Sequence, residues 1–103
     1  MKFESTPRFE KDLKSLSKEH QKLFRELLPT FTAACDAYIA AQGAFVWPKP
    51  LRVNKLMSAK GIWEMTWSFA SPDGRATFEF ANTLEGVRLR WRRIGDHNVF
   101  REP

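Results

Sequence analysis

The segment 87–92 constrains the fold of this chain more than any other, because apolar and basic residues alternate strictly along it. Its residues are, in order, Val87, Arg88, Leu89, Arg90, Trp91 and Arg92. Successive side chains of a β-strand point to opposite faces of a sheet, so the pattern predicts a strand with one apolar and one cationic face. A fold for this chain must therefore bury one sheet face and leave three guanidinium groups on the other.

Two earlier segments show the same period of two. The apolar positions of the first are Trp63, Met65, Trp67 and Phe69, and those of the second are Ala76, Phe78 and Phe80. Between them, Ser71–Gly74 has the composition of a hairpin turn, since Pro72 presets φ and Gly74 tolerates positive φ. These segments predict consecutive antiparallel strands, and a short edge strand at residues 2–5 is a further option.

The first part of the chain has the period of helices. Thr6 followed by Pro7 is typical of a helix start, and Ser17 is suited to cap a second helix from Lys18. An apolar stripe of helical spacing then continues to Tyr38. Because a proline inside a helix removes a hydrogen bond, we expect Pro29 to kink this helix or to break it in two.

The predicted fold class is α+β. Two N-terminal helices are expected to pack on a twisted antiparallel sheet of about four strands, with the whole chain 1–103 forming a single domain. A length of 103 residues is enough for one core and too short for two.

Composition narrows the functional classes. The formal net charge of +5 favours an anionic partner. A single cysteine, Cys35, and the lack of a long apolar run favour a cytoplasmic protein that does not span a membrane. The sequence has no Cys/His cluster with metal-ligand spacing and no glycine-rich phosphate loop, so we expect neither a metal site nor a cofactor.

Six basic residues are candidates for holding a nucleic-acid backbone: Lys55, Lys60, Arg75, Arg88, Arg90 and Arg92. The alternative is that Glu64 and Glu79, on the same polar face, form cross-strand ion pairs with the arginines. Two acids cannot neutralise four arginines, so an excess of positive charge is expected to remain.

His97 follows the turn at Gly95 and Asp96, directly after the arginine-rich strand. An imidazole titrates near neutral pH, so His97 is a candidate general acid or base. The residues alone are equally consistent with the alternative, in which His97 is a turn histidine without a chemical role. His20 and Cys35 lie on the apolar helical stripe and are expected to pack, with Cys35 as an inert buried thiol.

Four segments covering most of the chain also carry a family resemblance: Phe9–Glu19, Leu56–Met65, Gly74–Phe78 and Ile94–Phe100. The first is similar to the helix and turn that open the RelE/ParE toxin superfamily of bacterial toxin–antitoxin systems. The others resemble its glycine-bearing loop and aromatic-Glu strand, its arginine-bearing strand and its terminal Gly-x-His segment. The order and spacing of the motifs resemble most the HigB-like, phage-derived group.

This resemblance implies a toxin that cleaves ribosome-bound mRNA without a metal ion and that an acidic antitoxin protein holds inactive over the basic face. By position, His97 would act as general acid or base and Arg75 would contact the scissile phosphate, while Lys55, Lys60 and Arg90 would bind RNA backbone. Other members of the superfamily poison DNA gyrase, which is the alternative function. A third reading is a member of the fold that binds nucleic acid or a partner without catalysis.

The chain departs from the family pattern at several positions. Met65 and Thr66 replace the usual Leu-Arg pair, and Phe100 stands where a tyrosine is common. Phenylalanine cannot exchange a proton, so a mechanism that uses a terminal tyrosine has no such group at Phe100.

Overall fold

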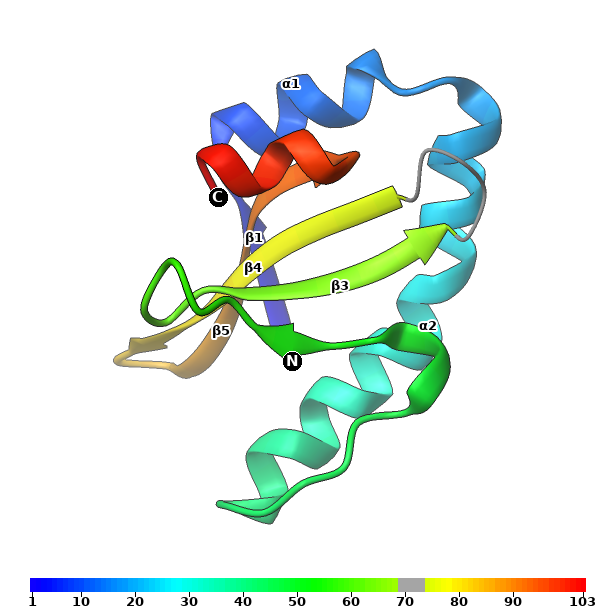
Figure 1. The fold of residues 1–103 in the computed structure, drawn as a ribbon. Helices are drawn as coiled ribbons and strands as arrows, with labels where there is room; N and C mark the ends of the chain where they lie inside the picture. The colour runs from blue at the N-terminus through cyan, green and yellow to red at the C-terminus, as the bar shows by residue number, and fades with distance from the viewer. Residues whose placement is uncertain (69–73) are drawn as a thin grey trace.

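A computed structural model describes residues 1–68 and 74–103 of the protein. The elements in chain order are β1 (Lys2–Ser5), α1 (Pro7–Ser15), α2 (Lys18–Ala41), η1 (Lys49–Leu51), β2 (Asn54–Lys55), β3 (Trp63–Ser68), β4 (Gly74–Thr83), β5 (Gly86–Gly95) and η2 (His97–Arg101) (Figure 1). The fold is α+β, as predicted. The predictions for Phe69 and for the turn at residues 71–73 fall outside the described residues.

Both helices begin where their capping residues predict. The backbone N–H of Phe9 donates to Thr6 Oγ1 at 3.1 Å, and that of His20 donates to Ser17 Oγ at 3.1 Å. Of the two alternatives expected at Pro29, a kink or a break, the break is wrong, because α2 continues from Lys18 to Ala41 with Pro29 inside it. Buried side chains on both sides of the proline, Phe24 and Phe31, hold the two halves against one sheet, and this packing overrides the local cost.

The sheet differs from the prediction in strand number and in direction. It has five strands in the order β1-β5-β4-β3-β2 rather than about four. It is mixed rather than antiparallel, since β1 pairs parallel to β5 with Lys2 opposite Arg88 and Ser5 opposite Trp91. β1 and β5 lie at opposite ends of the chain, with both helices and three strands between them, so this connection is long enough for a parallel pair, which a short turn cannot join.

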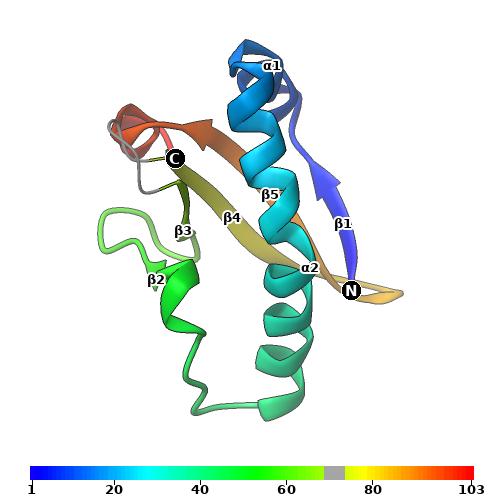
Figure 2. The same cartoon turned by 90° about the vertical axis from the view of Figure 1, so that its right-hand side faces the viewer.

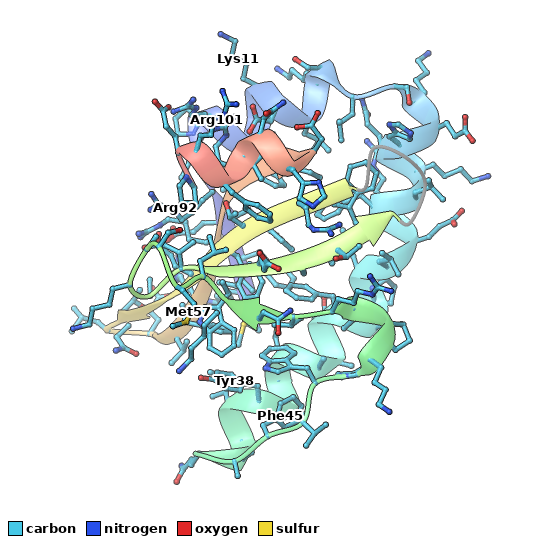
Figure 3. All side chains as sticks on the ribbon, in the orientation of Figure 1. Lys11, Tyr38, Phe45, Met57, Arg92 and Arg101 are labelled. Atoms are coloured by element: carbon cyan, nitrogen blue, oxygen red, sulfur yellow. The ribbon has the colours of Figure 1, made fainter. Side chains whose placement is uncertain are left out.

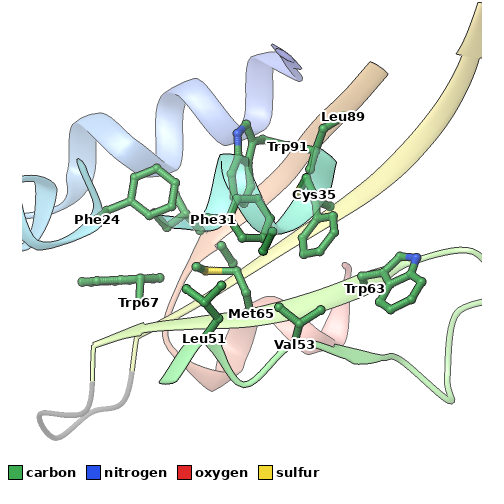
Figure 4. Close-up of a cluster of buried hydrophobic side chains, with 14 of the residues drawn as sticks. Phe24, Phe31, Cys35, Leu51, Val53, Trp63, Met65, Trp67, Leu89 and Trp91 are labelled. Atoms are coloured by element: carbon green, nitrogen blue, oxygen red, sulfur yellow. The ribbon is translucent and has the colours of Figure 1, made fainter. Parts of the chain in front are cut away.

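The helix α2 lies along one face of the sheet (Figure 2). The Phe31 ring lies between the layers, with its centroid 5.1 Å from that of Phe78 and 5.0 Å from that of Trp91. Met65 and Leu89 are fully buried beside it (Figure 4). The apolar alternation predicted for β3, β4 and β5 is therefore confirmed within the described residues.

The other face of the sheet is covered in part by η2 and the residues after it (Figure 1). Thr77 Oγ1 donates to the Pro103 carbonyl at 3.2 Å, and Arg92 Nε donates to the same oxygen at 2.8 Å. A Cβ on Gly95 would lie 3.1 Å from Val99 Cγ1, so glycine permits η2 to approach the sheet closely. This packing fixes where η2 presents its first residue, His97.

Near this end of the sheet, β5 contains one extra residue. Phe78 pairs with Trp91 and Thr77 with Arg93, so Arg92 has no partner on β4. Such a bulge shifts the alternation by one position, which places Ile94 on the buried face.

Within residues 1–68 and 74–103, no helix is both long and apolar enough to span a membrane.

Candidate active site

The structure brings together two residues that the sequence analysis selected for catalysis, His97 and Arg75. His97 begins η2 and is exposed, with its ring centroid 5.8 Å from that of Phe100. Asp96 fixes the start of η2, because its carboxylate accepts a hydrogen bond from the Asn98 N–H at 2.8 Å. The imidazole is thus held at a defined place on the surface.

Arg75 is the second residue of β4 and lies on the face that η2 partly covers. It is opposite Gly95 on β5 and opposite Thr66 on β3. Its guanidinium Nη1 donates to the Gly74 carbonyl at 3.3 Å. Because Gly95 has no side chain, Val99 of η2 can pack closely on β5 next to Arg75.

Glu64 is the third member of this cluster. It lies on β3 opposite Thr77, two positions from the Thr66–Arg75 pair, so its side chain is a diagonal neighbour of Arg75 on the same face. Burial raises the pKa of the Glu64 carboxyl, while the nearby charges of Arg75 and His97 partly oppose that rise. The Glu64 carboxyl therefore lies within electrostatic reach of both Arg75 and His97, and we call these three residues the acid–base cluster.

The sequence analysis treated Glu64 only as an ion-pair partner and missed its place in this cluster. In the sequence, Glu64 stands between the apolar Trp63 and Met65, and this alternation places it on the polar face of the strand. Combining that position with the register of β3 against β4 would have placed it beside Arg75.

Arg88, Arg90 and Arg92 of β5 are partly exposed, but each has an acidic partner. Glu79 accepts hydrogen bonds from both Arg90 and Arg92, and Glu4 on β1 also pairs with Arg90 at 2.8 Å. Arg88 pairs with Glu85 at 2.7 Å. The predicted ion pairing is confirmed for Glu79. Glu4 on β1 and Glu85 in the β4–β5 turn neutralise further arginine charge, which was not predicted from the sequence.

Arg93 and Asp12 join α1 to the bulged end of β5. Asp12 Oδ2 accepts hydrogen bonds from Arg93 Nε at 2.6 Å and from the Ile94 N–H at 3.2 Å. Both side chains of the pair are largely buried, at 15% and 17% exposure. A charge-assisted contact at this position ties the helix to the strand that leads into η2.

Lys55 lies away from the arginines of β5. β2 and β5 are separated by β3 and β4 in the sheet. Lys55 is opposite Trp63, so its side chain is on the α2 side, with Nζ 5.2 Å from the centroid of the Trp63 ring. Lys60 lies in the loop between β2 and β3 and borders the same hollow as Lys55. The structure therefore does not bring Lys55 to the face that carries the acid–base cluster.

The remaining chemically notable side chains have packing roles. The His20 ring meets the Trp67 ring edge-on at 5.4 Å, as expected of a residue at the boundary of the core. Cys35 is fully buried, and burial raises the pKa of its thiol to about 12, so the expected inert thiol is confirmed. Among the described residues, no group of three or more His, Cys, Asp or Glu side chains is arranged to hold a metal ion.

Comparison of the chain with protein-family models, with curated proteins and with solved structures gives no match.

Proposed function

We propose that this protein is a RelE/ParE-like toxin that acts as an endoribonuclease on ribosome-bound mRNA. The observation that carries the proposal is the acid–base cluster. Glu64, Arg75 and His97 come from three separate elements and gather on the sheet face that η2 partly covers. Cleavage of RNA by its own 2′-hydroxyl needs a general base, a general acid and a cation at the phosphate, and a carboxylate, an imidazole and a guanidinium can supply them.

In the proposed reaction, the Glu64 carboxylate accepts the proton of the 2′-hydroxyl as the 2′-oxygen bonds to phosphorus. The His97 imidazolium donates a proton to the 5′-oxygen as the P–O5′ bond breaks. Arg75 stabilises the negative charge that grows on the phosphoryl oxygens. The products are a 2′,3′-cyclic phosphate and a 5′-hydroxyl end. The raised pKa of Glu64 suits this role, because a general base works best when its pKa lies close to the working pH.

The arginines of β5 would hold the RNA backbone that runs along the sheet from the cleaved bond. Arg88, Arg90 and Arg92 alternate with buried residues and share the face of Arg75. To bind phosphate they must exchange their contacts with Glu79, Glu4 and Glu85. An acidic antitoxin protein that competes for these same arginines would inhibit the protein.

The test is cleavage of mRNA in a reconstituted translation reaction, with RNA ends mapped by primer extension. Single-turnover cleavage should fall by roughly two to four decades in His97→Ala and in Glu64→Gln, because each removes a proton-transfer group. Arg75→Ala should slow cleavage as well, because it removes the cation from the transition state.

His20→Gln is the matched control, since His20 is the only other histidine in the sequence and contacts Trp67 rather than the cluster. It should cleave at a rate close to wild type. Growth arrest with intact mRNA and blocked DNA supercoiling would instead assign gyrase inhibition. If the folded protein neither cleaves mRNA nor blocks supercoiling, the remaining function is binding of nucleic acid or a partner without catalysis.

A further inference from the structure

A hollow lined by aromatic and aliphatic side chains lies on the α2 side of the sheet, beside β2. Its volume is about 590 Å³, and its walls are Tyr38, Leu56, Met57, Trp63 and Phe80, with Lys55 and Lys60 at the rim. We call this the aromatic groove. Figure 3 shows Tyr38, Phe45 and Met57 together at the end of the molecule away from Arg101. Trp63 in the wall of the groove and the adjacent Glu64 point to opposite faces of the sheet, so the groove is separate from the acid–base cluster.

Apolar surface at this end of the molecule is unusually exposed. Met57, in the wall of the groove, has 98% of its surface exposed, and Val46, in the segment after α2, has 88%. Phe45 is half-buried, and its ring meets that of Tyr38 at 6.0 Å. Exposed apolar side chains clustered around a hollow are typical of surfaces that bind another molecule.

The faces of the groove's rings are already occupied. Tyr38 is stacked on Trp47 at 5.1 Å and on Phe80 at 5.2 Å. Trp63 is stacked on Phe78 at 6.3 Å and also has the Lys55 ammonium over its ring. A nucleobase needs an open ring face for stacking, so the groove is better suited to aliphatic side chains that contact ring edges and Met57.

The rim of the groove is positively charged. Within the described residues, neither Lys55 nor Lys60 forms an ion pair with a carboxylate, in contrast to the arginines of β5. Two unneutralised ammonium groups beside an apolar hollow favour a partner that carries both carboxylates and apolar side chains. A second copy of this chain would place like charges together, so it is a poor occupant.

We propose that the aromatic groove binds a segment of an acidic partner protein. The partner's apolar side chains enter the hollow against Tyr38, Trp63 and Phe80, and its carboxylates pair with Lys55 and Lys60. This proposal is independent of the proposed nuclease activity, because it uses no residue of the acid–base cluster and concerns the opposite side of the sheet.

The test uses a defined probe, a 14-residue peptide in which leucine and phenylalanine recur at helical spacing among glutamates. Titration into the ¹⁵N-labelled protein should shift the amide signals of residues 55–61 and the indole N–H signal of Trp63. The double variant Lys55→Glu, Lys60→Glu should weaken binding at least about tenfold, because both carboxylate contacts are lost. A peptide with lysine in place of glutamate should not bind.

The matched control is the double variant Lys18→Glu, Lys22→Glu, which makes the same charge change on exposed positions of α2. It should bind the acidic peptide almost as well as wild type, because its substitutions lie outside the groove. The proposal would be overturned by an absence of shifts up to about 1 mM peptide, or by equal weakening in both double variants. It would also be overturned if oligouridylate shifted the groove signals and the acidic peptide did not.

Discussion

At the scale of single residues, Glu64 combines a cost to stability with a role in the proposed chemistry. Its folded-state pKa is raised above the ordinary value of 4.5, mainly by burial. The folded protein therefore holds this proton to a higher pH than the unfolded chain does. Between the two pKa values, the free energy of unfolding falls as the pH rises.

Glu64→Gln should consequently gain stability over wild type as the pH rises through and above the ordinary carboxyl pKa of 4.5, with little gain at lower pH. Urea unfolding at a series of pH values measures the difference. Glu26→Gln is the control, since Glu26 is exposed and pairs with Lys22 on the same helix. A stability difference that does not vary with pH, or that falls as the pH rises, would contradict the raised pKa.

Residues whose roles are set by near neighbours in the sequence were the ones that the sequence predicted well. Thr6 and Ser17 cap helices because each needs only the backbone three residues ahead. Glu64 was missed because its surroundings come from β4 and η2. Lys55 was predicted to share the arginine face because β2 has only two residues, too few for an alternating pattern to show which face the Lys55 side chain occupies.

At the scale of elements, α2 contains an unfavourable residue that tertiary packing tolerates. Pro29 is exposed inside the helix and cannot donate a hydrogen bond to the carbonyl of Arg25. Pro29→Ala should raise the free energy of unfolding by up to about 3 kcal/mol, because it supplies the missing donor and removes the steric clash of the ring. Thermal and urea unfolding measure the change.

The control is Thr30→Ala, at the next position of α2, which is also exposed. It changes helix propensity alone, so its increase in the free energy of unfolding should be much smaller than that of Pro29→Ala. An unchanged or lower stability in Pro29→Ala would show that the proline suits the curvature of α2 in this fold.

Strand pairing was less predictable than the strands themselves. The alternation in β3, β4 and β5 depends on burial of one face, so it is visible in the sequence. The parallel pairing of β1 with β5 depends on contacts between opposite ends of the chain, which no local pattern encodes. The extra residue at Arg92 is likewise a property of two strands together.

At the scale of the whole molecule, internal acids limit the charge that β5 presents. Glu79 pairs with both Arg90 and Arg92. If these arginines bind phosphate, Glu79→Gln should release Arg92 from its carboxylate and leave Arg90 paired with Glu4 alone. Affinity for single-stranded RNA should then rise, and the slope of log affinity against log salt should steepen by roughly 0.7 for the released arginine.

Glu19→Gln changes the net charge equally, at an exposed position in the first turn of α2. It should leave the salt slope almost unchanged. Equal effects of the two substitutions would mean that Arg90 and Arg92 serve only to hold the sheet together.

The pairing of β1 with β5 also determines when the protein can acquire its structure. Glu4 and Arg90 contact each other across 86 positions of sequence, and Thr6 donates a hydrogen bond to the Arg92 carbonyl. Such remote contacts slow folding, because the chain must close a long loop before they form. While a ribosome is still adding β5, β1 has no neighbour and α2 has no complete sheet to cover. The newly made chain therefore remains without its native core until synthesis has passed residue 95, and any activity of the folded protein begins only then.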